Sequence, residues 1–276
     1  HQYIVKYMTL INIGIAGCLG RMGQELVKEI VNNNLLNFTG GFEHPQHKNL
    51  NNKISDLIDV KTKHIITDNS KEIFSNSDVI IDFTTPESTL QNVLMALEHN
   101  TPIVVGTTGL NEKIINVIKK GSENIPILQS SNMSVGVNLL FNLVERVAST
   151  LNDVDYDIEI AETHHKHKID APSGTAITLG EFAAKGRQIN FNKAKVLDRT
   201  DSLSEHKKGS IGFAVTRGGE IAGEHTVSFI GTNDRIDLVH KAQNRSIFVK
   251  GAIEAAIFIS DKKNGLYFME DVIKSK

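Results

Sequence analysis

One short stretch, from Glu162 to Thr175, gathers side chains that can move protons directly ahead of a turn that can bind an anion. It contains three histidines and two lysines, namely His164, His165, Lys166, His167 and Lys168. Histidine titrates near neutral pH, and lysine supplies a positive charge and a proton. Ser173-Gly174-Thr175 then opens an apolar run that predicts a helix, whose first N–H groups are free to bind an anion. The stretch is therefore predicted to hold a small acid and to give it protons.

A metal site and a solvated basic loop are the two alternative interpretations of this stretch. Structural zinc sites combine His with Cys at close spacing, and the single cysteine, Cys18, lies far away in the sequence. Clusters of charge are usually solvated surface. An alternating strand over 157–161, then the basic loop, then the Ser-Gly-Thr turn is an order of parts that favours a binding site.

The second candidate site is a glycine-rich turn near the N-terminus. Glycine recurs every third residue, at Gly14, Gly17, Gly20 and Gly23, across an apolar strand, a turn and the start of a helix. Such a turn lets the backbone approach a dinucleotide, although a strict G-x-G-x-x-G is absent. Glu43 ends the next predicted strand, 20 residues beyond Gly23, where an acid can bind ribose hydroxyls. Tight packing at a strand-helix corner is the alternative explanation of the glycines.

Two neighbouring features are interpreted in the light of that turn. Gly106-Thr107-Thr108-Gly109 follows an apolar run at the edge where parallel α/β sheets bind ligands. By itself it is equally consistent with a simple turn, but beside a dinucleotide site it is placed to contact nicotinamide. Cys18 is predicted to be a small packed residue and not a nucleophile, because no motif around it supplies an activating base.

The first half of the chain alternates short apolar runs with helical patterns, which is typical of βαβ units and a parallel sheet. Helices are predicted after Gly20, after Thr85 as the capping residue of Pro86, and after Asn111 as a cap, the last ending at Gly121. Strands are predicted over 10–16, 38–43, 65–66, 79–83, 102–105 and 126–129.

After Ser134 the pattern changes to α+β. A long helix over 135–150 precedes strands that we interpret as antiparallel, because Gly-rich turns join them. A final apolar helix, over about 247–259, is expected to return to the first domain. We therefore expect a dinucleotide-binding domain over 1–133 plus about 243–276, and a substrate-binding domain over 134–242. The predicted antiparallel strands cover 157–162, 210–216, 224–229 and 234–239.

The amino-acid composition argues against several classes of protein. A chain of 276 residues is long enough for about two domains, and its net charge of −2 offers no basic surface to nucleic acid or membranes. One cysteine excludes an internal disulfide and fits a reducing cytosol. No apolar run approaches the ~18 residues of a membrane span, and the N-terminus lacks a signal-peptide pattern. Met8 is the expected natural start, with His1 to Tyr7 as an extension before it.

Four motifs follow one another along the chain: GCLGRMG at 17–23, GTTG at 106–109, SNMSVGVN at 131–138 and HHKHKIDAPSGT at 164–175. Together they resemble the 4-hydroxy-tetrahydrodipicolinate reductase family, long called dihydrodipicolinate reductases. The resemblance implies an α/β fold, with an N-terminal Rossmann dinucleotide-binding domain and a C-terminal α+β domain for substrate binding and assembly of a homotetramer. It also implies a cytoplasmic enzyme that reduces 4-hydroxy-tetrahydrodipicolinate with NADH or NADPH on the diaminopimelate route to lysine.

The resemblance also implies roles for individual residues. His164 and Lys168 correspond to the catalytic positions, and which of them is the decisive proton donor stays open. The implied substrate-binding residues are His165, Ser173, Gly174 and Thr175. No metal is implied. The implied nucleotide contacts are Gly17, Cys18, Leu19, Gly20, Arg21, Met22, Glu43, Gly106, Thr107, Thr108, Ser130, Ser131, Asn132 and Met133.

His44 departs from the pattern of the family. Many members follow the acidic residue with an arginine suited to the 2′-phosphate of NADPH, whereas this chain has His44 after Glu43. A carboxylate accepts hydrogen bonds from ribose hydroxyls but repels a phosphate, so we expect NADH to be used at least as well as NADPH. A protonated His44 would partly offset that repulsion, and His47 and Lys48 lie nearby in the sequence.

Two rival functions stay open at this point. One is a different two-domain Rossmann oxidoreductase that acts on a sugar or an amino acid, since a fold alone does not determine a substrate. The other is a non-catalytic nucleotide sensor or metal-binding regulator, which would need neither Lys168 nor an anion site.

Overall fold

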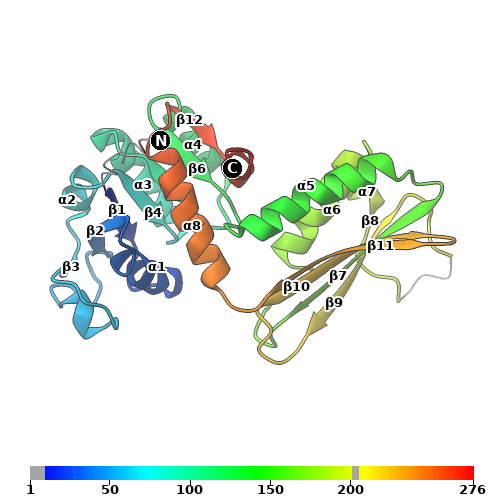
Figure 1. Cartoon of the computed structure of the whole chain (residues 1–276), viewed down its shortest axis with the longest axis horizontal. Helices are drawn as coiled ribbons and strands as arrows, with labels where there is room; N and C mark the ends of the chain where they lie inside the picture. The colour runs from blue at the N-terminus through cyan, green and yellow to red at the C-terminus, as the bar shows by residue number, and fades with distance from the viewer. Residues whose placement is uncertain (1–9, 201–204) are drawn as a thin grey trace, which may run out of the picture. The chain divides into compact units, whose positions relative to one another are not determined.

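The computed structural model describes residues 10–200 and 205–276, so Met8 and the extension before it lie outside the described residues. The chain divides into two compact units (Figure 1). Unit 1 comprises residues up to Ser134 together with Phe248–Lys276, and unit 2 comprises Val135–Ile247. The apolar helix that was predicted over about 247–259 therefore belongs to unit 1. Among the described residues, no helix is long and apolar enough to cross a membrane.

Unit 1 contains a parallel sheet of seven strands. The order across the sheet is β12-β6-β5-β4-β1-β2-β3, and every pair is parallel. The order reverses between β1 and β4, so the loops after these two strands diverge and leave space for a ligand. The strands are β1 (Ile11–Ala16), β2 (Leu36–Phe42), β3 (Ile66–Thr67), β4 (Val79–Asp82), β5 (Ile103–Val105), β6 (Pro126–Gln129) and β12 (Gly265–Tyr267).

The helices of unit 1 begin where the capping residues predict. The Thr85 hydroxyl accepts a hydrogen bond from the Ser88 amide at 3.4 Å, and the Asn111 side chain accepts one from the Ile114 amide at 3.0 Å. The short elements α2, β12 and α9 were not expected, because each is too short to show a hydrophobic period. The helices are α1 (Arg21–Val31), α2 (Ser70–Ser75), α3 (Pro86–His99), α4 (Glu112–Gly121), α8 (Ser246–Ile259) and α9 (Met269–Lys274), with a 3₁₀ turn at Ile54–Asp56.

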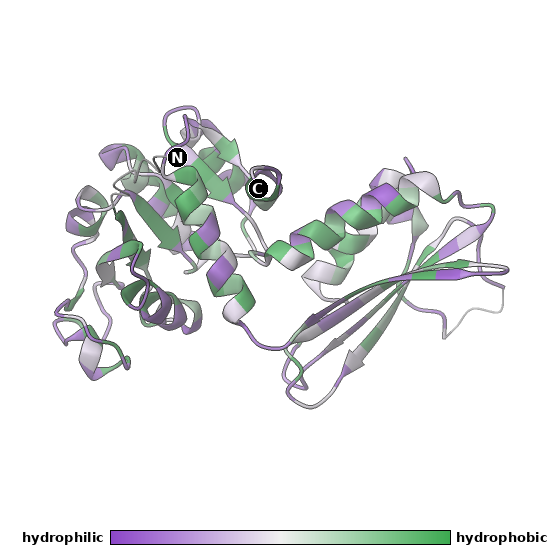
Figure 2. Cartoon of the chain, in the orientation of Figure 1, coloured by the Kyte–Doolittle hydropathy of each residue, from purple (hydrophilic) through white to green (hydrophobic). Residues whose placement is uncertain are grey.

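The strands of unit 1 are apolar almost throughout, as Figure 2 shows by their green colour. Ile13, Ile15, Ile80, Ile81 and Val104 are all completely buried. Strands that are covered on both faces lose the alternation of apolar and polar residues, which is expected of a parallel sheet with helices on each side. The predicted α/β domain is therefore confirmed.

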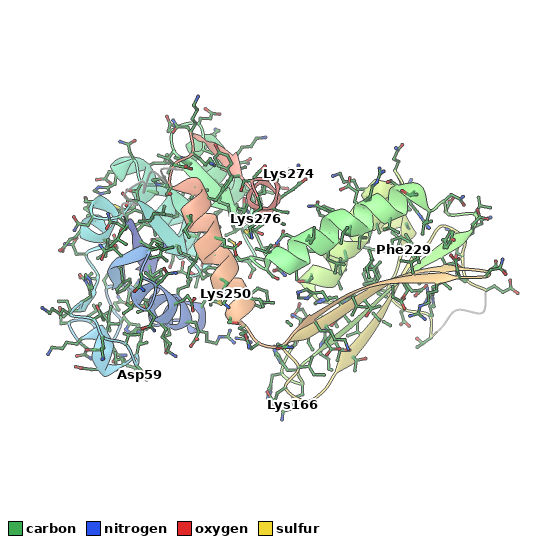
Figure 3. All side chains as sticks on the ribbon, in the orientation of Figure 1. Asp59, Lys166, Phe229, Lys250, Lys274 and Lys276 are labelled. Atoms are coloured by element: carbon green, nitrogen blue, oxygen red, sulfur yellow. The ribbon has the colours of Figure 1, made fainter. Side chains whose placement is uncertain are left out.

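Unit 2 is a two-layer α+β structure. Its strands run in the order β11-β10-β7-β9-β8, and helices α5 and α6 cover one face of the sheet (Figure 1). Phe229, labelled in Figure 3, is completely buried in the core between these layers. The elements are α5 (Val135–Thr150), β7 (Tyr156–His164), α6 (Gly174–Gly186), α7 (Phe191–Ala194), β8 (Lys195–Val196), β9 (Ile211–Arg217), β10 (Gly223–Gly231) and β11 (Arg235–Ala242).

The prediction that all four long strands of unit 2 are antiparallel was wrong for one of them. Strand β10 pairs with β7 and β11 in the antiparallel sense, but β9 runs parallel to β7. The connection from β7 to β9 contains helices α6 and α7, and a helical crossover returns the chain in the same direction. The helix after Ser173 was predicted, but the interpretation from turn residues did not treat it as a crossover between two strands; the sheet is therefore mixed.

The second face of the sheet in unit 2 carries a row of small and β-branched residues. Val239, Thr226, Ala161 and Ala214 lie opposite one another across β11, β10, β7 and β9. Side chains alternate between faces along a strand, so this row points away from Ile158, Ile160 and Val227 of the core. No helix in the described part of unit 2 covers it, and Val239 is 50% exposed.

Candidate functional site

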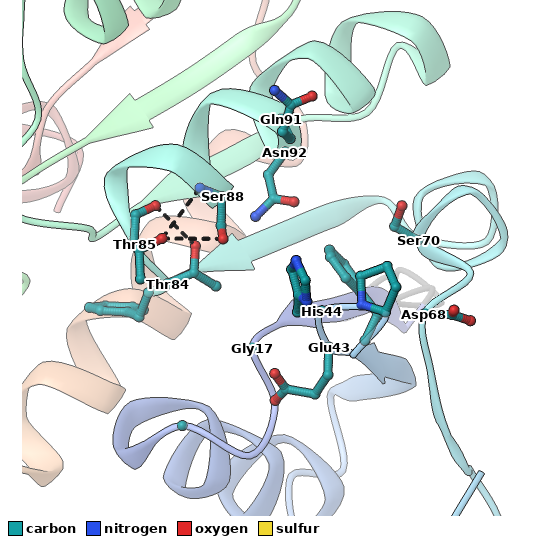
Figure 4. Close-up of a pocket in the computed structure, with 14 residues that line it drawn as sticks. Gly17, Glu43, His44, Asp68, Ser70, Thr84, Thr85, Ser88, Gln91 and Asn92 are labelled. Carbon is teal, nitrogen blue, oxygen red and sulfur yellow. Dashed lines mark hydrogen bonds between the residues drawn. The ribbon is translucent and has the colours of Figure 1, made fainter. Parts of the chain in front are cut away.

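A pocket of about 620 Å³ lies in unit 1 beside the ends of β1, β2 and β4. Figure 4 shows Gly17 and Glu43 near one another, with Thr84, Thr85 and Ser88 across from them. This is the position at which the order of the strands reverses, as expected for a dinucleotide site. The lining residues are Gly17, Gly20, Phe42, Glu43, His44, Pro45, Asp68, Ser70, Phe83, Thr84, Thr85, Ser88, Gln91 and Asn92.

The glycine turn is packed as closely as its sequence predicts. Gly17 has a φ of +68°, which favours glycine, and its carbonyl accepts a hydrogen bond from the Gly20 amide at 3.0 Å. A Cβ atom at Gly23 would lie 2.1 Å from the Gly17 carbonyl oxygen. The packing interpretation of the glycines therefore holds, because they let α1 approach the turn; Gly17 and Gly20 also leave their backbone bare at the pocket.

Cys18 is buried against Gly41 of β2, and burial raises the pKa of its thiol to about 12. The prediction that it is a small packed residue is confirmed, and a protonated thiol is a poor nucleophile. Its side chain is fully covered, so any contact with a nucleotide would be made by its backbone. Of its neighbours in the turn, Arg21 is exposed, and Leu19 and Met22 are half-buried.

Glu43 also makes a structural hydrogen bond that the sequence did not reveal. Its carboxylate accepts a hydrogen bond from the Leu19 amide at 2.7 Å, which ties the end of β2 to the glycine turn. Carboxylates carry several acceptor sites, so one bond to the turn is compatible with further bonds to ribose hydroxyls. His44 lines the same pocket and is exposed.

The other predicted nucleotide residues follow β5, which is next to β4, and β6, which is next to β5. The Gly106 amide donates to the Asp82 carbonyl at 2.8 Å, and the Thr107 hydroxyl is buried and accepts a hydrogen bond from Thr89. None of Gly106, Thr107, Thr108, Ser130, Ser131, Asn132 and Met133 is among the lining residues of the pocket. They share its edge of the sheet because parallel strands end at one edge.

The catalytic candidates gather in unit 2 around the buried carboxylate of Glu162, on β7. His164 Nδ1 lies 2.5 Å from Glu162 Oε2, and the Ser173 amide donates to Oε1 at 2.9 Å. Both terminal nitrogens of Arg217, on β9, donate to the same carboxylate at 2.8 Å. Burial would raise the pKa of Glu162, but the bonds from Arg217, His164 and Ser173 outweigh it and hold the pKa below its usual range.

Lys168 belongs to the same cluster through Asp170. Its Nζ donates to Asp170 Oδ1 at 2.8 Å, and the carbonyl of Asp170 accepts a hydrogen bond from Arg217 at 2.6 Å. The side chain of Lys168 is 21% exposed, against 60% for Lys166. Lys166, labelled in Figure 3, therefore points to solvent, and Lys168 is the lysine of this loop that is held in place.

His225, on β10, completes the cluster behind His164. The two rings meet edge to face with centroids 5.1 Å apart, and His225 Nε2 lies 3.1 Å from the Ser173 hydroxyl. Burial, with a smaller contribution from the nearby His164, lowers the pKa of His225 to about 4. Burial also lowers the pKa of His164, although Glu162 opposes this effect. Both rings are therefore predominantly neutral at pH 7.

The remaining predicted residues lie around the start of α6. Ser173 caps this helix, and its hydroxyl accepts a hydrogen bond from the Ala176 amide at 3.1 Å. Gly174 is exposed, and a Cβ atom placed on it would meet nothing within 4 Å. His165 Nδ1 is buried and has no hydrogen-bond partner among the described residues, which leaves it available to a ligand.

Comparison with known proteins adds independent information. Residues 11–133 match the family described as dihydrodipicolinate reductase, N-terminus, and residues 136–273 match its C-terminus. The chain is 41% identical over 261 residues to the 4-hydroxy-tetrahydrodipicolinate reductase of Polynucleobacter necessarius, covering 95% of this chain and 98% of that protein. It is also 41% identical over 266 residues to that of Nitrosospira multiformis, covering 96% and 98%.

The chain belongs to the dihydrodipicolinate reductase family. A solved structure of the family, the dipicolinate-bound enzyme from a Paenisporosarcina species, superposes with a TM-score of 0.74 at 22% identity, over 94% of this chain and 98% of that one. An amine dehydrogenase from Mycobacterium smegmatis superposes with a TM-score of 0.61 at 7% identity, over 95% and 96%. At such identities, both likenesses concern the fold alone.

Reasoning from the sequence missed several residues of both sites in this family member. Arg217 and His225 lie more than 40 residues beyond the histidine-rich stretch, and only the pairing of β9 and β10 with β7 brings them back to it. Thr84 and Thr85 follow β4, whose position next to β1 could have identified them as pocket residues. Within the described residues, no group of three or more His, Cys, Asp or Glu is arranged to hold a metal ion.

The buried His225 should make the stability of unit 2 depend on pH. Below about pH 6.5 the unfolded chain binds a proton at this residue, while the folded protein does not until about pH 4. Stability is therefore lost as the pH falls across this range, and His225 alone should contribute a loss of about 3 kcal/mol. Denaturant unfolding of the wild type and of His225→Gln at pH 7, 5.5 and 4 measures this difference.

His167→Gln is the matched control for that measurement, because the side chain of His167 is 68% exposed and folding changes its surroundings little. It should reproduce the pH dependence of the wild type. An equally steep loss of stability in His225→Gln would contradict the assignment.

Proposed function

We propose that this chain, like the relatives named 4-hydroxy-tetrahydrodipicolinate reductase, reduces that substrate. The proposed product is tetrahydrodipicolinate, the reductant is a nicotinamide cofactor, and the reaction belongs to the diaminopimelate route to lysine in the cytoplasm. The cluster of Glu162, His164, Lys168 and Arg217 carries the proposal, because it holds proton-transfer groups beside the helix start at Ser173. Freshly prepared 4-hydroxy-tetrahydrodipicolinate and NADH, with oxidation of NADH followed by its absorbance, provide the direct test.

The residues of unit 1 fit a dinucleotide. Gly17 and Gly20 leave bare backbone at the pocket, Glu43 offers acceptor oxygens to ribose hydroxyls, and α1 begins immediately after the turn. When bound, the nicotinamide supplies the hydride of the reaction. Since side chains can supply the proton, no metal is part of this proposal.

Lys168 and His164 are proposed to be the residues that transfer the proton. An ammonium group stabilises negative charge that develops on the substrate and can donate a proton to it, and a positioned acid contributes roughly 10²–10⁴-fold. Lys168 is held by Asp170, and His164 is held by Glu162. Burial lowers the pKa of His164, which favours the neutral ring, so Lys168, which is ion-paired with Asp170, is the better candidate for the proton donor.

The start of α6 is proposed to bind one of the two carboxylates of the substrate. Ser173, Gly174 and Thr175 begin a helix of 13 residues, whose N-terminal end carries a partial positive charge. Gly174 leaves open space over this helix start, so a carboxylate can approach the backbone. His165, with its unpartnered Nδ1, is proposed as a further donor to the substrate.

We further propose that four copies of the chain assemble through the open face of the sheet in unit 2. Val239, Thr226, Ala161 and Ala214 form a row of small side chains on that face, and Ala161 and Ala214 are exposed in the single chain. Exposed apolar rows of this kind mark interaction surfaces.

Replacement of Lys168 by methionine should separate chemistry from nucleotide binding. We expect turnover to fall by at least about a hundredfold, as for loss of a positioned acid, while NADH affinity measured by calorimetry stays unchanged. Lys166→Met, on the exposed lysine of the same loop, is the control and should keep wild-type turnover. Near-normal turnover in Lys168→Met would remove this residue from the mechanism.

NADH should support a kcat/KM at least equal to that with NADPH, because Glu43 repels a 2′-phosphate. The informative variant is Glu43→Gln, whose amide oxygen can still accept from the Leu19 amide, whereas alanine would also release the glycine turn. Glu43→Gln combined with His44→Arg should shift the ratio of kcat/KM values toward NADPH. A preference of the wild type for NADPH of more than about tenfold, or roughly 1.4 kcal/mol, would contradict this reading of the pocket.

Ala214→Arg should break the proposed homotetramer, because it places a charge in the middle of the small-residue row. Light scattering coupled to size-exclusion chromatography should give four chains for the wild type and fewer for this variant. Ser149→Arg, on an exposed position of α5, should leave the assembly intact. A monomeric wild type would contradict the proposed assembly through the open face of the sheet.

A further inference from the structure

Glu162 is a buried carboxylate whose two oxygens are both saturated with hydrogen bonds. Oε2 receives His164 Nδ1 and one nitrogen of Arg217, and Oε1 receives the other nitrogen of Arg217 and the Ser173 amide. A carboxylate has about four acceptor sites, so none is left for a substrate. Glu162 therefore acts through other residues.

These bonds determine which nitrogen of His164 carries the proton. Arginine and the backbone amide are donors only, and the paired guanidinium together with the other bonds holds the pKa of Glu162 below its usual range, so the carboxylate is ionised. An ionised carboxylate cannot donate, so His164 Nδ1 must carry a hydrogen and point it at Oε2. In the neutral ring, Nε2 is then the nitrogen with the free lone pair. A Cβ atom at Gly223 would lie 2.9 Å from that Nε2, so the glycine leaves the space beside it open.

The same carboxylate restrains both ends of the segment from Asp170 to Ser173. Glu162 binds the Ser173 amide directly, and Arg217, paired with Glu162 through two bonds, binds the Asp170 carbonyl at 2.6 Å. Asp170 in turn accepts from Lys168. One buried group thus connects the histidine, the lysine and the helix start that the proposed reaction needs.

The charges that face His164 come from four elements. Glu162 lies on the same strand, Lys168 and Asp170 on the following loop, Arg217 on β9 and His225 on β10, with His240 of β11 beyond His225. Among the groups that act on His164, Glu162 alone favours the protonated ring, since Lys168 and Arg217 disfavour it and burial does so most strongly. Removal of the negative charge of Glu162 would leave burial, Lys168 and Arg217 acting against the protonated ring.

We infer that Glu162 is a positioning residue that sets the tautomer of His164 and, through Arg217, holds the loop that carries Lys168 against β7. The inference rests on the proposed function for its effect on turnover, but the tautomer can be observed without any assay. A carboxylate that binds Nδ1 of a catalytic histidine orients the ring and selects its tautomer in many unrelated enzymes.

The chain provides a matched control on the same strand. Glu159 also forms a two-bond pair with an arginine, Arg199, at 2.9 and 2.6 Å. It lies an odd number of residues from Glu162 and therefore on the opposite face of β7, away from His164. Glu159→Gln removes the same charge from the same type of pair without touching the cluster.

The test combines ¹⁵N NMR of the histidine rings with steady-state kinetics, and His164→Asn serves only to assign the His164 signals. Wild-type His164 should be protonated at Nδ1 in its neutral form. In Glu162→Gln the side-chain amide can donate to Nδ1, so the proton should move to Nε2. The kcat should fall by about a hundredfold while NADH affinity is retained, because a misplaced catalytic group costs about that much. Glu159→Gln should change neither the tautomer nor the kcat.

A wild-type His164 protonated at Nε2 would overturn the inference, and so would a Glu162→Gln variant with wild-type kcat. Should that variant fail to fold, the wild-type tautomer still decides the first part. Arg217→Lys then decides the second part: the tautomer should persist, while loss of the paired bonds should lower kcat/KM by at least about tenfold. Wild-type kcat/KM in Arg217→Lys would refute the role of Arg217. A wild type without any reductase activity would refute the proposed function, and the tautomer measurement would be unaffected.

Discussion

The buried carboxylate of Glu162 is the interaction on which the rest of unit 2 depends. An ionised group inside a protein is strongly unfavourable unless charged and hydrogen-bonding partners surround it. Here the partners come from the same strand, from β9 and from the start of α6. Each partner is needed to keep the charge buried. The positions of the histidine, the arginine and the helix start therefore all follow from the need to stabilise one buried carboxylate. A cluster built this way is rigid before any substrate binds.

The candidate site of unit 1 is built in the opposite way, without a buried charge at its centre. Its site depends on the absence of side chains at Gly17, Gly20 and Gly23, which lets the helix and the turn approach one another and leaves backbone groups at the pocket. Two carboxyl groups then secure the loops around it. Glu43 binds the Leu19 amide, and the buried Asp82 binds the amide and hydroxyl of Thr84. Burial raises the pKa of Asp82, although hydrogen bonds from Thr84 and Asn92 oppose this effect.

The two kinds of site suit two kinds of ligand. A dinucleotide is long and is recognised along its length by backbone and ribose contacts, for which a bare turn at the end of a strand is sufficient. A small dicarboxylate offers few contacts, and its reduction requires a proton at one atom, so the groups around it must be held firmly. The dense hydrogen bonding of His164, Lys168 and Ser173 meets that need, whereas the pocket of unit 1 offers the bare backbone of Gly17 and Gly20.

Sequence by itself determined the α/β domain, its main helix caps, the glycine turn and the histidine-rich stretch, because periodicity, capping residues and close motifs are local properties of the chain. It also carried the resemblance to the family that the comparisons establish. Only the tertiary structure decided that β9 runs parallel to β7 and that Arg217 and His225 join the histidines. It also revealed the bond from Glu43 to Leu19 and made Glu162 the centre of the cluster. These facts depend on strand pairing between residues far apart in the sequence, and a pairing leaves no local pattern from which it could be predicted.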